Sequence, residues 1–378
     1  MATRVLVLGG GSGGLVAANK VKKLLGREVE VTLVDKNPYH EFMPAYPWVA
    51  FGMREPEQVR RPLANLAKRG ITYLQATVEA LDPANNRVKT SAGELSYDYL
   101  IVSLGAEALP SPAQDGHAPW SLEGALKLRE ALKNFKGGRV VVGVSSPYYP
   151  CPPAPYEVAG QVEFALKVKG IRDKSTVEVF HLNPLPLAGM GPVISGKVME
   201  ILRSKGIAFH GEFEPASFEG GKVRAKDGRE LAYDLLILTP PFAPNRVVRE
   251  SPLAGPQGFP EVNKMTFRST RFANVFVIGD TVNPSLMLPP AGVVAHFQGE
   301  YVAGVIASDL KGAYIGEPFN PVAMCIMDFG DNALLPQCSF ERILAGTGMP
   351  SCGVMAVGKW VRVTKMLFEG FWFATLIE

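Results

Sequence analysis

A glycine-rich turn near the N-terminus limits the possible folds of this chain more than any other feature. It follows the apolar run of residues 4–8, which is typical of a buried strand, and it carries Gly9, Gly11 and Gly14. In such a pattern the first glycine permits a tight turn, the second lets the backbone approach a pyrophosphate, and the third allows close helix packing. A second apolar run ends on Asp35, 21 residues after Gly14, where a carboxylate can accept ribose hydroxyls. The pattern predicts a dinucleotide-binding domain.

The chain also matches itself at an offset of 135 or 136 residues. Residues 4–7 (Arg-Val-Leu-Val) match residues 139–142 (Arg-Val-Val-Val), and residues 94–98 match residues 230–234. A repeat with so constant an offset indicates two domains of the same kind. The predicted fold class is α/β, with two Rossmann-like domains in tandem, each a doubly wound sheet in three layers, followed by a C-terminal region.

The second copy lacks the phosphate loop. The three glycines of the first copy correspond to Val144, Ser146 and Tyr149, and the ribose-binding acid corresponds to His181, which we interpret as a structural histidine. Side chains at those positions block the approach of the backbone to a pyrophosphate, so we expect no binding of NAD(H) in the usual manner. The segment that replaces the loop is rich in proline and contains Cys151. The repeat places it where a nicotinamide would otherwise approach a flavin.

Further strand ends supply candidate contacts to the bound dinucleotide, which we take to be FAD. A strand that ends at Gly105 would let the backbone come close to the cofactor. Asp280 follows another strand, where it could bond a ribityl hydroxyl or only cap a turn. A helix that opens at Ala291 and Gly292 would direct its positive end at a reduced flavin. The cofactor-binding candidates are Gly9, Gly11, Gly14, Asp35, Lys36, Val78, Gly105, Asp280, Ala291 and Gly292.

Charge and cysteine content exclude several classes of protein. The net charge of +3 comes from 39 basic and 36 acidic residues in mixed order, so nucleic acid is not an expected partner. No secretory signal peptide and no apolar run long enough for a membrane-spanning helix are visible. The four cysteines are too few for a disulfide scaffold and match no zinc-binding spacing, so we expect no metal.

Several motifs resemble the sulfide:quinone oxidoreductase family. They are residues 37–50, the Cys151 segment with Pro155-Tyr156-Glu157, Ile278-Gly279-Asp280, and residues 324–330. That family shares its fold with the flavoprotein subunit of flavocytochrome c sulfide dehydrogenase and with type II NADH dehydrogenases. The resemblance covers essentially the whole chain. It implies FAD-dependent oxidation of sulfide to polysulfide or sulfur, with transfer of two electrons to a membrane quinone, ubiquinone or menaquinone.

The resemblance also implies a catalytic site. Cys151 and Cys325 match the family's cysteine pair, which sulfur bridges during turnover, and Glu157 matches a carboxylate proposed to handle protons. As a general base Glu157 would need a pKa raised by burial; the alternative is a solvated glutamate in the first turn of a helix. Pro289 and Phe329, with the aromatic residues of the C-terminal segment, are candidate quinone contacts.

The sequence departs from the family at the other cysteines. Many members have a third cysteine before the position of Cys151, associated with the methyl edge of the flavin, and none stands between Met1 and Pro150. We therefore expect FAD to be bound without a covalent bond. Cys338 and Cys352 have no clear counterparts; they would pair with each other or hold sulfur, and Cys352 would replace Cys325 if that residue lay far from the flavin.

The C-terminal segment of residues 359–373 combines aromatic and basic residues. Eight uncharged residues at 370–377 cannot cross a bilayer, but the mixture suits a helix that lies in a membrane surface. We therefore predict a peripheral membrane protein, while an amphipathic element packed on the core or on a second subunit of a homo-oligomer is the alternative.

The predicted domains are residues 1–110 with 246–315 (FAD-binding), residues 111–245 (the second Rossmann-like domain) and residues 316–378 (the redox cysteine and the membrane or quinone element). The leading function is sulfide:quinone oxidoreductase. The alternatives are a sulfide dehydrogenase flavoprotein that passes electrons to a cytochrome c, a type II NADH:quinone dehydrogenase-like flavoprotein, and a flavin-loaded redox sensor without turnover.

Overall fold

The first β-sheet is parallel and contains strands from distant parts of the chain. The computed structural model describes residues 2–315, 319 and 321–378. The strand order is β19-β9-β1-β2-β5. The bounds are β1 (Thr3–Leu8), β2 (Val29–Asp35), β5 (Thr72–Gln75), β9 (Tyr99–Val102) and β19 (Val275–Val277). This is the doubly wound order that was predicted, and its strands, apart from the edge strand β5, are largely buried, as expected for a parallel sheet covered on both faces.

Two helices of the first domain pack closely because glycines lie between them. Helix α1 (Ser12–Leu25) follows the glycine-rich turn, and α7 (Gly292–Lys311) packs against it. A Cβ atom on Gly14 would lie 1.9 Å from the carbonyl oxygen of Gly9, and one on Gly299 would lie 2.5 Å from that of Gly13. A side chain on Gly299 would push α7 away from α1, and one on Gly14 would push α1 away from the turn that precedes it.

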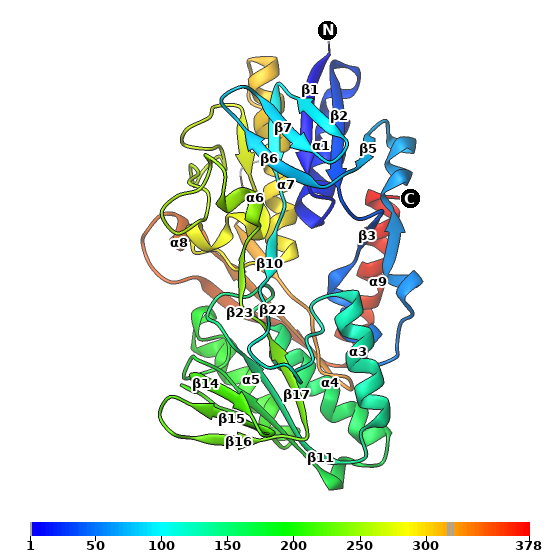
Figure 1. The fold of residues 1–378 in the computed structure, drawn as a ribbon, viewed down its shortest axis with the longest axis vertical. Coiled ribbons are helices and arrows are strands. Elements are labelled where there is room, and N and C mark those ends of the chain that lie inside the picture. The colour runs from blue at the N-terminus through cyan, green and yellow to red at the C-terminus, as the bar shows by residue number, and fades with distance from the viewer. Residues whose placement is uncertain (1, 316–318, 320) are drawn as a thin grey trace.

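The second parallel sheet repeats the first. Its order is β13-β12-β11-β17, with bounds β11 (Gly138–Val144), β12 (Ser175–Phe180), β13 (Ile207–His210) and β17 (Leu235–Thr239). Helix α4 (Ala154–Val168) packs on this sheet, and α5 (Pro192–Ser204) packs on β13. The two sheets lie toward opposite ends of the long axis in Figure 1.

Each half also carries a three-stranded antiparallel sheet at the same point of the repeat. These sheets are β6 (Val78–Asp82), β7 (Arg87–Thr90) and β8 (Gly93–Ser96) in the first half, and β14 (Pro215–Glu219), β15 (Lys222–Ala225) and β16 (Glu230–Ala232) in the second. The chain passes between the halves along β10 (Ala106–Ala108) and returns along β18 (Phe242–Pro244), and these two strands pair with each other. The pairing lies next to the predicted boundaries at 110 and 245, and the domain division stays a prediction.

Shorter elements complete the two halves. They are β3 (Tyr39–Glu41) paired with β4 (Arg60–Pro62), and the helices α2 (Tyr46–Ala50), α3 (Leu122–Asn134) and α6 (Arg246–Arg249). Helix α3 begins at a serine cap, since the Ser121 side chain accepts a hydrogen bond from the backbone N–H of Gly124. It packs on α2.

The C-terminal region is an antiparallel sheet followed by a long helix. The sheet contains β20 (Val322–Met324), β21 (Met327–Asp328), β22 (Ala333–Ser339) and β23 (Ser351–Val357), with α8 (Glu341–Leu344) between the last two strands. Helix α9 (Lys359–Leu376) is amphipathic. One side carries the exposed apolar residues Trp360, Val363, Leu367 and Phe371, and the other buries Val361, Lys365, Glu369, Trp372 and Phe373. In the described residues, no helix combines the length and the apolar character needed to cross a membrane.

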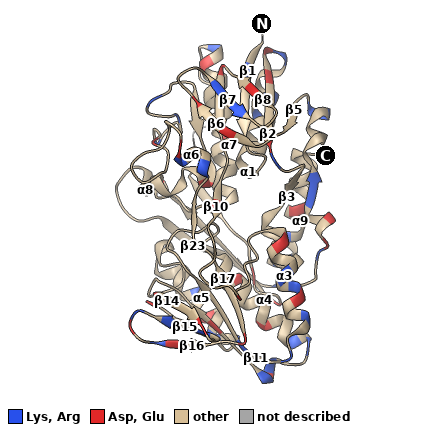
Figure 2. Ribbon diagram, in the orientation of Figure 1, with Lys and Arg blue, Asp and Glu red and all other residues tan. Residues whose placement is uncertain are grey.

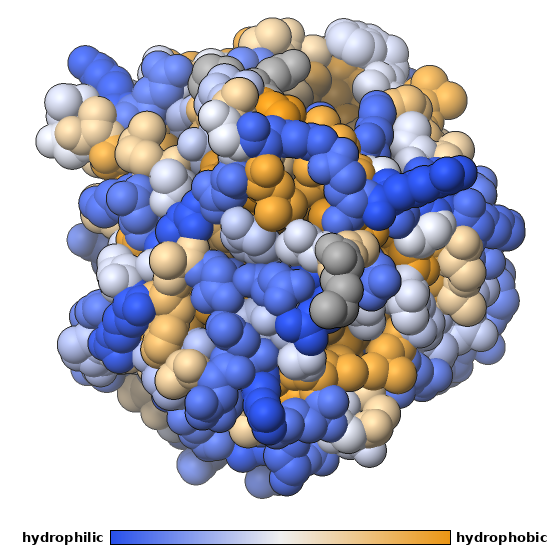
Figure 3. Space-filling model, turned by 90° about the horizontal axis from the view of Figure 1, so that it is seen from above, coloured by the Kyte–Doolittle hydropathy of each residue, from blue (hydrophilic) through white to orange (hydrophobic). Residues whose placement is uncertain are grey.

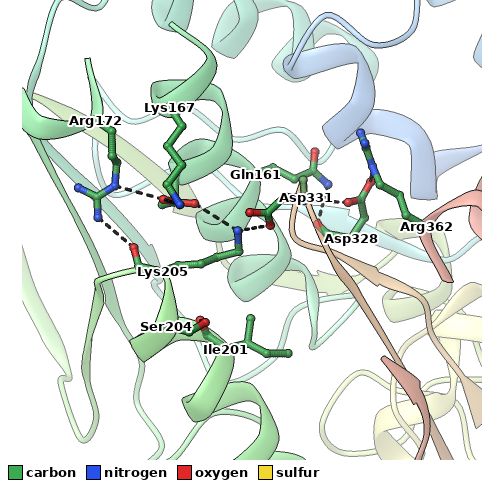
Figure 4. Close-up of polar contacts among 11 residues, drawn as sticks. Gln161, Lys167, Arg172, Ile201, Ser204, Lys205, Asp328, Asp331 and Arg362 are labelled. Atoms are coloured by element: carbon green, nitrogen blue, oxygen red, sulfur yellow. Dashed lines mark hydrogen bonds and ion pairs between the residues drawn. The ribbon is translucent and has the colours of Figure 1, made fainter. Parts of the chain in front are cut away.

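Buried charges join the second domain to the C-terminal sheet. Glu163 of α4 is fully buried and pairs with Lys167, Arg172 and Lys205, at 2.6, 3.4 and 3.2 Å. Lys205 also pairs with Asp331, in the turn between β21 and β22. Figure 4 shows these cations converging from different elements. Acidic and basic residues are interspersed along the ribbon in Figure 2, and Figure 3 shows a mainly polar face with apolar patches.

Candidate functional site

The predicted dinucleotide loop has open space at its centre. Gly9 adopts a φ of +100°, and a Cβ atom on Gly11 would meet nothing within 4 Å. The N–H of Gly10 donates a hydrogen bond of 2.6 Å to Asp35 at the end of β2. Burial raises the pKa of that carboxyl, although backbone N–H groups partly offset the effect. Lys36, the next residue, is exposed. The loop thus offers a pyrophosphate both room and the N-terminus of α1.

The other cofactor candidates surround the same loop. The N–H of Gly105 donates a hydrogen bond of 2.7 Å to Thr281 Oγ1, which brings two distant strand ends together. Val78 is buried on β6, two residues after Ala76, whose N–H bonds the carbonyl oxygen of Asp35. At the start of α7, Ala291 precedes Gly292, where a Cβ atom would lie 3.2 Å from the Ser12 hydroxyl. All these candidates therefore lie around the ends of the first sheet.

Asp280 is the clearest sign that a group from outside the chain belongs here. Within the described residues its buried Oδ1 atom has no hydrogen-bond partner. Burial raises the pKa of Asp280 to about 7. An unsatisfied buried carboxylate oxygen is costly, and a hydroxyl of a bound cofactor would remove that cost. The residues present therefore fit a flavin dinucleotide.

Cys151 stands in a turn that is anchored to the cofactor side. Its φ of +57° lies in the left-handed region, which is rare for a residue with a side chain. Its N–H donates a hydrogen bond of 2.7 Å to the carbonyl oxygen of Pro290, just before α7. The Tyr148 hydroxyl donates to the carbonyl oxygen of Asp280 at 3.0 Å. These contacts hold the loop of the second domain against the first, and strained backbone of this kind concentrates at functional sites.

The structure brings Cys151 and Cys325 together. Both cysteines are free, and they lie close enough for each to shift the pKa of the other. The interaction with Cys325, reinforced by burial, raises the pKa of Cys151, whereas the interaction with Cys151 lowers the pKa of Cys325. Of the two thiols, Cys325 is therefore the one that loses its proton more readily.

Glu157 lies beside this pair and is deeply buried. Its side chain is in the first turn of α4, and burial raises the pKa of its carboxyl to about 7 even though Lys365 of α9 pairs with it and opposes the shift. Gln161 donates a hydrogen bond of 3.2 Å to the same carboxylate. The alternative of a solvated glutamate is therefore wrong, because the residue is only 3% exposed.

The sequence did not identify three residues that lie around Glu157 and the cysteines, namely Asp328, Arg362 and Lys365. Asp328 is fully buried and accepts hydrogen bonds from the indole of Trp48 at 2.8 Å and from Arg362 at 3.0 Å. The Lys365 ammonium lies 5.2 Å from the centre of the Trp48 ring. Figure 4 shows Gln161, Asp328 and Arg362 meeting at one point. The available signal was the four-residue spacing of Val361, Lys365 and Glu369, which places charges on the inner side of an amphipathic helix.

The predicted quinone contacts lie in different surroundings. Phe329 is fully buried, and its ring takes up the space beside Gly160, where a Cβ atom would lie 2.5 Å away. Pro289 lines a cavity of about 320 Å³ with Tyr148, Tyr149 and other residues of the Cys151 loop. Phe329 is not among the residues that line this cavity, and the role of both residues stays a prediction.

His181 has a structural role, as interpreted from the sequence. Its Nδ1 accepts a hydrogen bond of 2.9 Å from the N–H of Asn183, and its Nε2 lies 3.0 Å from the Tyr149 hydroxyl. Burial lowers the pKa of His181 to about 4, so the ring is neutral. Tyr149 itself is buried where the first copy has its third glycine. Failure to bind NAD(H) at this position stays a prediction.

Cys338 and Cys352 form a disulfide between β22 and β23. The first of the two predicted alternatives, mutual pairing, is the one observed. Cys352 was the alternative to Cys325 only if Cys325 lay far from the flavin; it is bonded to Cys338, whereas Cys325 lies at Cys151, so Cys325 stays the predicted partner.

Comparisons with known proteins agree with this geometry. A model of the pyridine nucleotide-disulphide oxidoreductase family matches residues 3–299. The chain is 28% identical to the sulfide-quinone reductase of Aquifex aeolicus, with 98% of this chain and 90% of that protein aligned. It is 26% identical to a mitochondrial sulfide:quinone oxidoreductase of Dictyostelium discoideum, over 84% of this chain and 72% of the relative. The crystal structure of the Aquifex aeolicus sulfide:quinone oxidoreductase superposes with a TM-score of 0.88 at 25% identity, covering 99% of this chain and 91% of that one. The predicted resemblance is confirmed.

Proposed function

Because the chain belongs to the pyridine nucleotide-disulphide oxidoreductase family, we propose that it is a FAD-dependent sulfide:quinone oxidoreductase. The observation that carries this proposal is the contact of Cys151 with Cys325 in a loop that is tied to Asp280 and Pro290. A pair of cysteines at that place supplies a sulfur electrophile next to a two-electron acceptor. The likeness to relatives named for this activity supports the same function.

The cofactor would be held by the loop at Gly9 and Gly11, by Asp35 and Asp280, and by the start of α7 at Gly292. When bound, FAD supplies an acceptor for two electrons. No cysteine precedes Cys151 in the sequence, so we propose that the flavin is bound without a covalent bond to the chain.

In the oxidised form of the site, Cys151 and Cys325 are joined by a disulfide. Hydrosulfide attacks Cys151 Sγ, a sulfur–sulfur bond forms there, and the bond to Cys325 breaks. The products are a Cys151 persulfide and a Cys325 thiolate, so atoms and charge balance. Cys325 is the better leaving group because its thiol has the lower pKa of the two and because the Lys365 ammonium stabilises its thiolate. The Cys325 thiolate then bonds to the outer sulfur of the Cys151 persulfide, so that the added sulfur bridges the two cysteines. This step releases two electrons, which bound FAD would accept, and one proton, which Glu157 can take up.

Glu157 handles the protons of these steps. With a pKa of about 7, its carboxylate is partly ionised near neutral pH and can accept the proton of the persulfide or of hydrogen sulfide. Lys365 supports these steps, because its ammonium stabilises negative charge on Glu157 and on Cys325.

We also propose that α9 attaches the protein to a membrane surface. Trp360, Leu367 and Phe371 are 62%, 69% and 65% exposed, and together they form an apolar strip along the helix. Such a helix would bring a lipid-soluble quinone close to the site. The double substitution Leu367→Glu and Phe371→Glu should release the protein from liposomes that contain anionic lipid. Val168→Glu, at a residue 74% exposed on α4, is the control and should leave binding unchanged. Equal binding of both variants would contradict the anchor.

The function is tested by anaerobic stopped-flow spectroscopy of the flavin. Sulfide should bleach the flavin absorbance, a ubiquinone or menaquinone analogue should restore it, and NADH should leave it oxidised. Cys151→Ser or Cys325→Ser should abolish bleaching by sulfide while FAD stays bound. Reduction by NADH would instead favour a type II NADH dehydrogenase, reoxidation by cytochrome c but not by quinone a flavocytochrome-type enzyme, and bleaching without turnover a sensor.

A further inference from the structure

The Cys338–Cys352 disulfide lies on the same side of the C-terminal sheet as Cys325. Strands β20 and β22 pair in an antiparallel register with Ala323 opposite Cys338. The N–H of Cys325 donates to the carbonyl oxygen of Pro336 at 3.4 Å, so the register continues two residues further. Because side chains alternate between the two faces of a sheet, Cys325 and Cys338 project from one face as diagonal neighbours on adjacent strands.

The sheet is interrupted at Cys325. Strand β20 ends one residue before it, and β21 begins at Met327. An antiparallel pair of this kind normally exchanges two backbone hydrogen bonds, but Pro336 has no N–H, so only one can form here. The Cys325 backbone is therefore held by one hydrogen bond fewer than a regular pair provides. A bond to Cys338 requires this segment to move, because diagonal neighbours lie about 7–8 Å apart whereas the Cα atoms of a disulfide lie about 5.5–6 Å apart.

The disulfide is poorly accessible from solvent at one sulfur. Cys338 is 2% exposed and belongs to the hydrophobic core, against which Cys325 and Cys352 both pack. A reagent in solution has little access to Cys338. Cys325, directly after the adjacent strand β20, can reach it from within the protein. Of the four cysteines in the chain, only Cys151 and Cys325 remain as internal partners, and Cys325 is the one on the adjacent strand.

We propose that Cys338 and Cys352 are a second redox pair that exchanges with the Cys151–Cys325 pair through Cys325. In the first step the Cys325 thiolate attacks Cys338 Sγ, a Cys325–Cys338 bond forms, and Cys352 leaves as a thiolate. In the second step Cys151, after losing its proton, attacks Cys325 Sγ and releases the Cys338 thiolate. Two electrons pass from the inner to the outer pair, the outer thiolates take up protons, and no external oxidant is consumed.

This exchange goes beyond the proposed function, because it needs no sulfide. It supplies the Cys151–Cys325 disulfide with which turnover begins, and it stores two further oxidising equivalents in the protein. The active-site bridge can thus be restored after adventitious reduction without exposure of the site to a solvent oxidant.

The contact is tested by leaving only two cysteines in the FAD-loaded protein. The double variant Cys151→Ser and Cys352→Ser keeps only Cys325 and Cys338. Mild oxidation with diamide should join them within one chain, which peptide mass spectrometry detects. The matched control, Cys325→Ser with Cys352→Ser, keeps Cys151 and Cys338 and should form at least tenfold less internal disulfide. Absence of the Cys325–Cys338 bond, or equal yields in both variants, would overturn the proposal.

The exchange itself is measured with the outer disulfide intact. In the natural protein, dithiothreitol should reduce Cys338–Cys352 through the inner pair, and thiol labelling with mass spectrometry gives the rate. The single variant Cys325→Ser should slow that reduction at least tenfold, while Cys151→Ser should accumulate the Cys325–Cys338 intermediate. Equal rates in the natural protein and in Cys325→Ser would show that the outer disulfide is only structural. Neither measurement uses sulfide or quinone, so its outcome is independent of the proposed function.

Discussion

Replacing Lys365 with methionine should make the stability of the protein depend on pH in a range where that of the natural protein does not. Methionine keeps the length and the apolar contacts of the side chain but removes the ammonium that pairs with Glu157. Burial raises the pKa of Glu157 to about 7 although this ammonium stands beside it. Without the ammonium the pKa of Glu157 must lie above 7, because burial is then opposed only by hydrogen bonds.

The magnitude follows from proton uptake on folding. The Glu157 carboxyl has a pKa of 4.5 in the unfolded chain and about 7 in the folded one, so its contribution to stability is complete below pH 4.5 and is lost as the pH rises to 7. The loss is about 1.4 kcal/mol per pH unit, and in the natural protein it ends near pH 7. In Lys365→Met it continues, so the variant should lose about 2 kcal/mol more than the natural protein between pH 7 and about 8.5.

Urea unfolding of both holoproteins at pH 6, 7, 8 and 8.5 measures the difference. Lys365 does not titrate in this range, because, although burial opposes its charge, the Glu157 carboxylate raises its pKa above 10.5. Lys359→Met, which removes an exposed lysine from the same helix, is the control and should shift stability by less than about 0.5 kcal/mol at every pH. A difference between Lys365→Met and the natural protein that stayed constant from pH 6 to 8.5 would refute the assignment of the pKa near 7 to Glu157.

Three other substitutions test separate parts of the structure. Asp280→Asn should weaken FAD binding about tenfold or more, because it removes the charge of a buried acceptor; flavin absorbance per protein after dialysis measures this, and undiminished affinity would contradict the fit. Glu163→Gln should lower the free energy of unfolding by about 3 to 5 kcal/mol, because the cations around it lose their buried partner, whereas Glu200→Gln at an exposed ion pair should lower it by less than about 1 kcal/mol. Urea unfolding measures both changes, and similar values for the two variants would disprove the role of the buried cluster. Gly299→Ala should lower the melting temperature, because its methyl group would lie 2.5 Å from a backbone oxygen of α1, whereas Gly196→Ala, whose methyl group meets nothing within 4 Å, should be neutral or stabilising by up to about 1 kcal/mol. A melting temperature of Gly299→Ala equal to that of the natural protein would contradict the close packing of α1 and α7.

The parts of the fold that depend on local pattern could be predicted from the sequence. The strand, the glycine turn and the helix at residues 4–23 are adjacent in the chain, and each residue type has its own backbone requirement. The internal repeat then extended this local prediction to the second sheet, in which β11 and β17 correspond to β1 and β9 of the first. The pairing of Cys151 with Cys325 came from the family resemblance, because nothing in their spacing indicates contact.

The parts that depend on long-range packing could not be predicted. Lys365 reaches Glu157 across 208 positions of the chain, and a lysine in an amphipathic helix is usually solvated, so only the packed structure shows that it is buried. Phe329, within the motif of residues 324–330, was a candidate quinone contact in the sequence, but it is fully buried. Its burial depends on Gly160 of α4, whose missing side chain leaves the space that the ring fills. A local pattern can place a residue on the inner side of a helix, but it does not identify the distant residue that contacts it.

The strands of the first sheet come from distant parts of the chain, and this sets the order in which the molecule can be completed during synthesis. All strands of the second sheet lie within residues 138–239, so that sheet can close while the first still lacks β19 at Val275–Val277. Domains generally fold as units as the chain emerges from the ribosome. The helix that carries Lys365 comes later still, after Cys151 and Cys325 have both been made. A nascent chain can therefore bring its two reactive sulfurs together before the ammonium that stabilises their negative charge exists, and the site becomes chemically competent only when α9 docks.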